Sequence, residues 1–406
     1  MDIHQTLRSY VNDKQEIYDV LKDFHCHLEE LYKECCDSVF GAPSKPCDDS
    51  SIYKIDLIVT HLHEHLNVGK WSEVPENKRK AFSAASFIKC SLLLQQSKEN
   101  VKQALECIDK GFLLGIPLKE NSNLLTQCAS YLNDDLEKSN KKELTESEEV
   151  PCKRVKYEND FWNIDANTIS VIKVPTLEEF YKNYFLKEIP VIMQGCMCHW
   201  PACSKWLNLK YLLKIAGGRT VPIEIGSSYS DTNFSQKLMT LKEFVDEYYL
   251  KTSKDIGYLA QHDLLNQVPE LKEDICIPEY CCTSRNFDDD NLFEPEINAW
   301  FGPEGTVSSL HQDPKDNFLC QVFGTKQVIL FAPTDNNFLY PHEETFLSNT
   351  AQVDPLKPDL DQFPDFAKAT MYKCLLNPQE MLYIPPKWWH HVTAIEKSFS
   401  VNFWWQ

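Results

Sequence analysis

The chain has 406 residues, of which 43% are hydrophobic and 25% charged, a balance typical of a soluble globular protein with two or three domains. Its 41 Lys and Arg residues and 60 Asp and Glu residues give a net charge of −19. This charge argues against direct binding of nucleic acid or of an anionic membrane, and it permits a basic protein or peptide partner. No apolar run is long enough to span a bilayer.

The sequence begins with a polar segment that has no apolar signal core, so we expect the protein in the nucleus, the cytoplasm or both. In these reducing compartments, most of the sixteen cysteines are expected to be free thiols. The basic cluster Lys153-Arg154-Val155-Lys156 could be a nuclear import signal, although a short basic cluster in a linker is more often solvated charge.

In the first third of the chain, apolar residues recur at the three- and four-residue spacing of helices. We expect one helix face from Ile17 to Leu31, a helix in SIYKIDLIVTHLHEHL, and two more over 78–96 and 99–116. The last of these weakly resembles one helix of a tetratricopeptide unit, so stacked helix pairs could bind a protein partner. The sequence predicts an α-helical domain over residues 1–132.

Residues 133–160 are rich in Glu, Lys, Asp and Ser, and we predict a charged flexible linker there. The composition changes over residues 161–406, where short apolar runs rich in Val, Ile and aromatic residues predict strands. Examples are IPVIMQG, TVPIEIG, QVILFAP, MLYIPP and SFSVNFWW. Because helices do not alternate regularly with these runs, we expect a double-sheet sandwich or barrel with helices outside it.

The tripeptide His311-Gln312-Asp313 offers the clearest chemistry. Residues two apart on a strand point to the same face, so an imidazole and a carboxylate are presented together. A histidine on a neighbouring strand would complete a set of two histidines and one carboxylate, which leaves open coordination positions on Fe(II). His390 and His391 are both candidates. The tripeptide alone is a weak signal, because an exposed surface turn is an equally ordinary setting for it.

Lys326 lies in an otherwise apolar run, and burying an ammonium group is costly unless an anion pairs with it. The distal carboxylate of a bound dicarboxylate would supply such an anion. The alternative is a solvated lysine on the turn that follows Gly324.

The run NAWFGPEGTVSSLHQDPKDNFLCQVFGTKQVILF resembles the core of the JmjC family of 2-oxoglutarate oxygenases. The motifs LYPHEETFLSNTAQVD, FPDFAKA, IPPKWWHHV and SFSVNFWW extend the resemblance over residues 165–406. The resemblance implies a double-stranded β-helix, which is a cupin-like jelly roll, and hence an α+β chain of two domains with a JmjC catalytic domain over 161–406. It also implies Fe(II) as the metal, with 2-oxoglutarate and O2 as cosubstrates of a dioxygenase.

The family motif places the second histidine ligand directly after an aromatic pair, which selects His390 over His391. The Fe(II) ligands that the resemblance implies are His311, Asp313 and His390. The residues that it implies for 2-oxoglutarate are Tyr258, Ser308, Asn317 and Lys326.

On the substrate side, the resemblance places Glu224 and Trp300 near the pocket, and Tyr229 and Asp231 are second-rank candidates. A guanidinium group favours a carboxylate and a flat aromatic neighbour, so we expect hydroxylation of an arginine side chain in a basic protein. Demethylation of methyl-lysine on a histone tail is the alternative. A different class is a non-catalytic, JmjC-shaped chromatin adaptor, but the intact ligand set favours an enzyme.

Overall fold

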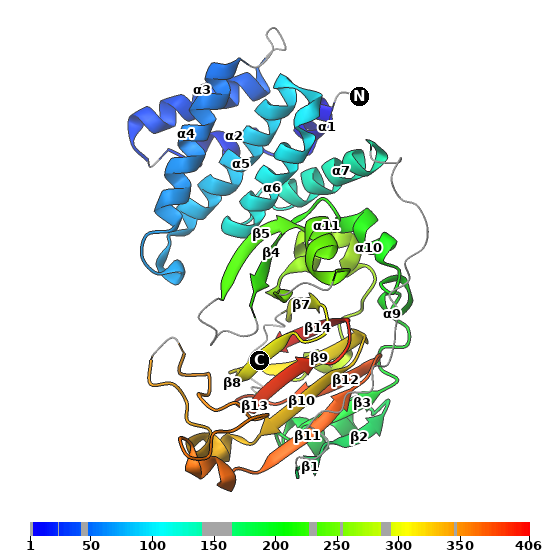
Figure 1. The fold of residues 1–406 in the computed structure, drawn as a ribbon. Helices are drawn as coiled ribbons and strands as arrows, with labels where there is room; N and C mark the ends of the chain where they lie inside the picture. Colours follow the sequence, from blue (N-terminus) through cyan, green and yellow to red (C-terminus); the bar gives the residue numbers. More distant parts are fainter. Residues whose placement is uncertain are drawn as a thin grey trace.

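The computed structural model describes residues 3–22, 24–41, 48–139, 165–226, 234–251, 255–285, 294–344 and 347–406. A helical region comes first along the chain, and a region of two β-sheets with short helices follows it (Figure 1). The prediction of an α+β chain with a jelly-roll of the cupin type is confirmed. The basic cluster at 153–156 lies outside the described residues.

The helical region is built around α5, a helix that is buried on nearly all sides. Small residues such as Ala84, Ala85 and Ser86 let α4 and α6 approach it closely, and they are almost inaccessible. None of the helices among the described residues has both the length and the apolar character that crossing a bilayer requires. The helices are α1 (Ile3–Ser9), α2 (Lys14–Asp19), α3 (Cys26–Phe40), α4 (Asp49–Leu66), α5 (Glu76–Gln96), α6 (Val101–Leu114) and α7 (Leu124–Ser139).

The prediction of one helix face from Ile17 to Leu31 is wrong. Asp13 caps the N-terminus of α2, which ends at Asp19, and α3 begins only at Cys26. Ile17 on α2 and Tyr32 on α3 are both buried in the same apolar cluster. The apolar spacing therefore continues across a turn, because two separate helices face one core.

The helical region also extends further than the sequence predicts, because α7 includes residues 133–139 of the expected linker. Asn133 is buried, and its side-chain nitrogen donates to the carbonyl oxygens of Lys214 and Ile215, at 3.1 and 2.9 Å. This contact with the β region orders the end of the helix. The rest of the expected linker, residues 140–160, lies outside the described residues.

The β region consists of two sheets with their strands in mixed chain order. The five-stranded sheet has the order β1-β11-β10-β13-β8, and the nine-stranded sheet has the order β2-β3-β12-β9-β14-β7-β6-β4-β5. The strands are β1 (Asn167–Thr168), β2 (Ser170–Lys173), β3 (Val191–Gln194), β4 (Thr220–Ile225), β5 (Ser235–Thr240), β6 (Gly257–His262), β7 (Glu296–Gly302), β8 (Val307–Gln312), β9 (Asp316–Phe323), β10 (Lys326–Phe331), β11 (Met371–Leu376), β12 (Glu380–Ile384), β13 (Trp389–Ala394) and β14 (Ser398–Trp405).

Alternation along the strands defines the inside and the outside of the β region. On β10, Val328 and Leu330 belong to an apolar cluster with residues of the opposite sheet, such as Leu319 and Leu382. Ile329 belongs to a different cluster, on the outer face of the five-stranded sheet. The space between the sheets is therefore lined by every second residue, as in a jelly roll.

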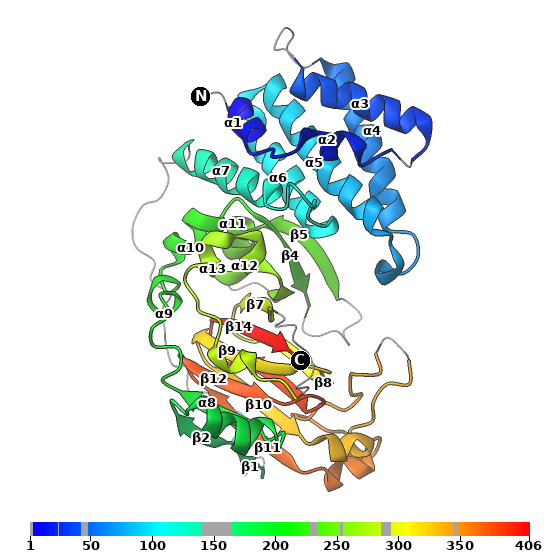
Figure 2. The same ribbon diagram turned by 180° about the vertical axis from the view of Figure 1, so that it is seen from behind.

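Short helices cover the nine-stranded sheet, and some of them lie between it and the helical region (Figure 2). α6 contacts β4, and α7 contacts α10. Gly218 lies at this contact, where an added Cβ would come within 2.9 Å of the Asn133 side chain. The short helices of the β region are α8 (Leu177–Phe180), α9 (Ala202–Lys205), α10 (Leu209–Ala216), α11 (Leu241–Phe244), α12 (Leu264–Gln267) and α13 (Pro269–Lys272).

Candidate metal centre

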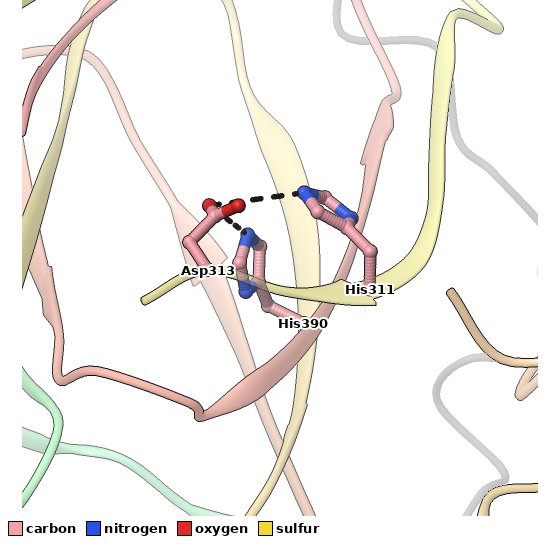
Figure 3. A group of neighbouring side chains, drawn as sticks. All are labelled: His311, Asp313 and His390. Atoms are coloured by element: carbon pink, nitrogen blue, oxygen red, sulfur yellow. Dashed lines mark ion pairs between the residues drawn. The ribbon is translucent and has the colours of Figure 1, made fainter. Parts of the chain in front are cut away.

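Two neighbouring antiparallel strands bring His311 and His390 together. His311 on β8 is the direct partner of His390 on β13, so the two side chains share the inner face of the five-stranded sheet. Asp313 follows the last residue of β8 and turns its carboxylate toward both imidazoles (Figure 3). One ligand atom of each of these three residues lies within 4.8 Å of the other two.

The cluster leaves a carboxylate oxygen without a hydrogen-bond donor. Asp313 Oδ2 is buried and accepts no hydrogen bond from any described residue. It lies 3.9 Å from His311 Nε2 and 3.6 Å from His390 Nε2, which is too long for hydrogen bonds. Burying a carboxylate oxygen without a hydrogen-bond donor lowers the stability of the folded protein. A cation coordinated by Asp313, His311 and His390 would remove this penalty.

The other ring nitrogens fix the orientation of both histidines. His311 Nδ1 lies 2.6 Å from the Ser309 carbonyl oxygen, and His390 Nδ1 lies 3.0 Å from that of Trp388. Each Nδ1–H therefore donates to a carbonyl, which directs the Nε2 lone pair toward Asp313. Burial, aided by the neighbouring imidazole of His311, holds the pKa of His390 below its ordinary value. A neutral imidazole is the form that binds metal, so the three residues fit a divalent cation.

His391 faces away from this cluster. Its partner on β10 is Ile329, which belongs to the outer apolar cluster, whereas the partner of His390 is Leu330, which belongs to the inner one. Burial lowers the pKa of His391 to about 4 as well, but its ring is on the other side of the sheet. The structure thus brings His390 to the centre and leaves His391 out.

A cavity between the sheets continues from the three residues. It is lined by all four residues that the sequence predicts for 2-oxoglutarate, together with Trp300. Its walls come from both sheets, since Lys326 and Ser308 belong to the five-stranded sheet and Asn317 and Tyr258 to the nine-stranded one. The cavity lining is Tyr258, Trp300, Ser308, His311, Asp313, Asn317, Leu319, Lys326, Ile384, His390, Val392, Asn402 and Trp404.

Lys326 is a buried cation in this cavity. Its side chain is 1% exposed, and no carboxylate among the described residues lies within ion-pair distance. Nζ donates to the Tyr258 hydroxyl over 3.3 Å and lies about 6 Å from the centre of the Trp300 ring. Burial lowers the pKa of Lys326 to about 7. The alternative of a solvated lysine on the turn is therefore excluded, and the cavity suits an anionic ligand.

Two cavity residues with side-chain hydrogen-bonding groups, Asn402 and Trp404, were not predicted from the sequence, and both lie on β14. Asn402 accepts from Trp300 Nε1 over 2.8 Å and donates to Asn317 Oδ1 over 3.2 Å. These bonds leave the amide nitrogen of Asn317 as a donor toward the cavity. Trp404 is the strand partner of Asn317, and its indole nitrogen has no hydrogen-bond partner among the described residues. A polar Asn inside SFSVNFWW, two residues from Trp404, was the available signal.

Of the four residues predicted to bind the substrate, one lines the cavity, one lies outside its lining, and two are not among the described residues. Trp300 lines the cavity. Glu224 is not part of the cavity lining, but it is the strand partner of Tyr258 across β4 and β6 and is partly exposed. Their side chains are therefore on one face of the sheet. Tyr229 and Asp231 lie outside the described residues.

Comparison with known proteins agrees with this geometry. A family model described as a cupin-like domain matches residues 177–406. The chain is 37% identical to lysine-specific demethylase 8 of Xenopus tropicalis, over 94% of the chain and 94% of that protein. It is 39% identical to the protein of the same name from Danio rerio, over 95% and 92%. It is 41% identical to Jumonji C domain-containing protein 5 of Drosophila melanogaster, over 87% and 86%. The chain belongs to the JmjC family of cupin-like proteins.

The resemblance to the JmjC family that the sequence motifs indicate is thus confirmed over most of the chain. The relatives cover the helical region as well as the β region, since the first two alignments span more than nine tenths of both proteins. Membership in the JmjC family supports an oxygenase that uses 2-oxoglutarate. It leaves the choice between arginine hydroxylation and lysine demethylation open.

Proposed function

We propose that this protein is an Fe(II)- and 2-oxoglutarate-dependent oxygenase that hydroxylates an arginine side chain in a basic protein. The observation that carries the proposal is the cluster of His311, Asp313 and His390 at one end of a cavity that also holds the buried cation Lys326. Fe(II) together with 2-oxoglutarate supplies the activation of O2 that places one oxygen atom in a substrate C–H bond.

The residues divide the task between them. His311, Asp313 and His390 would hold Fe(II) and leave positions open for ligands other than protein side chains. The ammonium group of Lys326 would pair with the distal carboxylate of 2-oxoglutarate. Tyr258, Ser308 and Asn317 would donate hydrogen bonds and fix the orientation of the bound dicarboxylate. Burial between two sheets keeps water away from the reacting atoms.

Arginine is the favoured substrate side chain because of what surrounds Lys326. Tyr258 and Trp300 lie within about 6 Å of its ammonium group, so these two rings already flank a cation of the protein itself. They do not form an open aromatic cage of the kind that binds methylated lysine. Glu224, on the same face as Tyr258, would offer a guanidinium group a carboxylate. We infer a nuclear or cytoplasmic protein substrate.

Lysine demethylation is the second candidate, and the names of two relatives favour it, since both are called lysine-specific demethylase 8. The two reactions share the metal centre and differ in the carbon that is oxidised. A hydroxylated side-chain carbon is stable, whereas a hydroxylated N-methyl group leaves as formaldehyde. A non-catalytic chromatin adaptor would not need two facing imidazoles, a buried carboxylate oxygen without a hydrogen-bond donor and a buried lysine together.

Mass spectrometry of basic peptides after incubation with the enzyme, Fe(II), ascorbate and 2-oxoglutarate separates the candidates. We expect a gain of one oxygen atom on an arginine of an unmethylated peptide, together with succinate. Loss of a methylene unit from a methyl-lysine peptide, with formaldehyde release, would instead establish demethylation. The adaptor is supported only if succinate fails to form with every peptide and also without peptide.

Replacing Glu224 by alanine is expected to abolish peptide oxidation while 2-oxoglutarate is still converted to succinate without peptide. The reason is that Glu224 would bind the substrate guanidinium and lies outside the cavity that holds the metal cluster. The measurement compares peptide product with succinate for wild type and variant. Lys237→Ala, on the exposed neighbouring strand β5, is the matched control. Normal peptide turnover in the Glu224→Ala variant would contradict the role given to this residue.

A further inference from the structure

A buried polar network joins the helical region to the nine-stranded sheet. Its centre is Asp109 on α6, which is completely buried. Asp109 Oδ1 accepts from Arg219 through Nε at 2.9 Å and Nη2 at 2.7 Å, and Arg219 is 1% exposed. Asp109 Oδ2 accepts from the backbone nitrogen of Thr220, the first residue of β4, at 2.7 Å. One carboxylate of the helical region thus holds the beginning of a strand.

The network continues to a second strand through Gln267 on α12. The side-chain nitrogen of Gln267 donates to Asp109 Oδ1 at 2.9 Å and to the Thr220 carbonyl oxygen at 2.8 Å. Its side-chain oxygen accepts from Nε2 of His262, the last residue of β6, at 2.6 Å. Burial lowers the pKa of His262 to about 4, so this histidine is neutral and donates. The beginning of β4 and the end of β6 are therefore both held by Asp109, the second one through Gln267.

The same two strands carry residues of the active site at their other ends. Glu224 is four residues from Thr220 on β4, and Tyr258 is four residues from His262 on β6. Glu224 and Tyr258 are strand partners, and the Tyr258 hydroxyl accepts from Lys326. Four residues of strand span about 13 Å, so the network lies near the active site without touching the cavity.

We propose that Asp109 is a positioning residue: the helical region, through this carboxylate, sets the placement of β4 and β6 and thereby of Tyr258 beside Lys326 and of Glu224 beside the substrate. The part of this proposal that concerns catalysis rests on the proposed function. The part that concerns the two strands does not, because it follows from the network alone. A partner that binds the helical region could act on the active site by this route.

The first test is hydrogen exchange, followed by mass spectrometry, on the full chain without added metal or 2-oxoglutarate. Asp109→Asn keeps the size of the side chain, but its amide nitrogen cannot accept, so one side of the network is lost. We expect faster exchange in 220–225 and 257–262 and unchanged exchange in β9, β10 and β13. Leu62→Ala, which opens a cavity in the core of the helical region, is the control for general loss of stability. Lys102→Ala removes the exposed ion pair with Glu243 and controls for any contact between the regions.

The second test is kinetic and uses the same variants. In Asp109→Asn, we expect the KM for 2-oxoglutarate to rise about 3- to 30-fold while kcat stays close to that of wild type. A residue that only stabilises the fold would lower the amount of active enzyme and leave KM unchanged, as we expect for Leu62→Ala. If wild type turns over no peptide and no 2-oxoglutarate, the proposed function fails, and the exchange experiment still decides whether Asp109 holds the two strands.

A second variant covers the case in which Asp109→Asn does not fold, because it weakens a buried ion pair. Gln267→Met has a similar volume and keeps the pair between Asp109 and Arg219, but it removes the bonds of Gln267 to Asp109, to His262 and to the Thr220 carbonyl. Faster exchange confined to 220–225 and 257–262 in either folded variant supports the proposal. Equal patterns in the variant and in Leu62→Ala, or a change in the helical region alone, overturn it.

Discussion

We expect that replacing His390 by alanine will abolish both metal binding and turnover, whereas replacing the adjacent His391 will leave both in place. The two residues follow one another in the sequence and are equally buried, but only His390 points to the inner face of the sheet, opposite His311. Loss of one of three protein ligands leaves two, which we expect to bind Fe(II) far more weakly. Comparison of the His390→Ala and His391→Ala variants thus distinguishes a metal ligand from a structural histidine on the same strand.

Metal binding is measured without turnover from the rise in Tm on addition of Co(II). A ligand present at 100 times its Kd stabilises a folded protein by about 2.7 kcal/mol, so wild type gains several degrees. His391→Ala starts from a lower Tm because it leaves a cavity in the outer cluster, yet it keeps the gain. For His390→Ala we expect no gain in Tm and no succinate. A metal-dependent gain in His390→Ala that equals the wild-type gain would refute the assignment of this ligand.

Lys326→Met is expected to make the unliganded protein more stable and to weaken 2-oxoglutarate binding by about 30-fold or more. Removal of one partner from a buried charge pair costs about 2–5 kcal/mol of binding free energy, which accounts for the loss of affinity. The gain in stability follows because the ammonium group is buried without a carboxylate partner among the described residues. Methionine has a similar length and needs no counter-ion. These opposite signs distinguish a ligand-binding lysine from a structural one.

The pH dependence has a definite sign. The pKa of Lys326 is about 7 in the folded protein, below its ordinary value of 10.5, so the unfolded chain binds the proton more tightly. Burial of the Lys326 ammonium group therefore lowers the free energy of unfolding by its full amount below pH 7, and this effect disappears as the pH rises toward 10.5. The stability gained in Lys326→Met is likewise largest below pH 7 and disappears toward pH 10.5. Binding of a dicarboxylate needs the protonated form, so affinity falls as the pH rises above about 7.

Calorimetric titration of 2-oxoglutarate at saturating Mn(II), from pH 6 to pH 9, measures this dependence. Leu319→Met, another substitution in the cavity wall, is the control for changes of packing. An affinity that is independent of pH in wild type, or a Lys326→Met variant that binds as tightly as wild type, would contradict the pairing of Lys326 with the dicarboxylate.

Short apolar runs made much of the β region predictable. The apolar runs of β3, β4, β10, β12 and β14 are strands, as the sequence predicts. His311 and Asp313 point to the same site, as their two-residue spacing predicts, although Asp313 lies just beyond the end of β8. These runs are visible because strands such as β10 and β12 bury both faces and are therefore continuously apolar. Alternation implies that only one of the two adjacent histidines can reach the centre, and the family motif selects His390.

Contacts between distant residues were not predictable. Asp109 and Arg219 are 110 positions apart, and nothing near either residue in the sequence indicates the other. Asn133 lies in a segment of polar composition, yet its contact with α10 keeps the end of α7 helical. The composition of a segment indicates only how much apolar surface that segment can bury by itself. The end of α7 is instead buried by contact with another part of the chain. The break between α2 and α3 was hidden because both helices face one core.

The position of β14 has a consequence for how the protein is made. Residues 398–405 form the last strand, yet this strand lies inside the nine-stranded sheet, between β9 and β7, and supplies Asn402 and Trp404 to the cavity. The helical region has mostly local contacts and can form early during synthesis. Until β14 is in place, β7 and β9 each leave the backbone groups of one edge unpaired, as edge strands prone to aggregation do. The nine-stranded sheet is therefore complete, and its central strands protected, only once residues 398–405 have joined it.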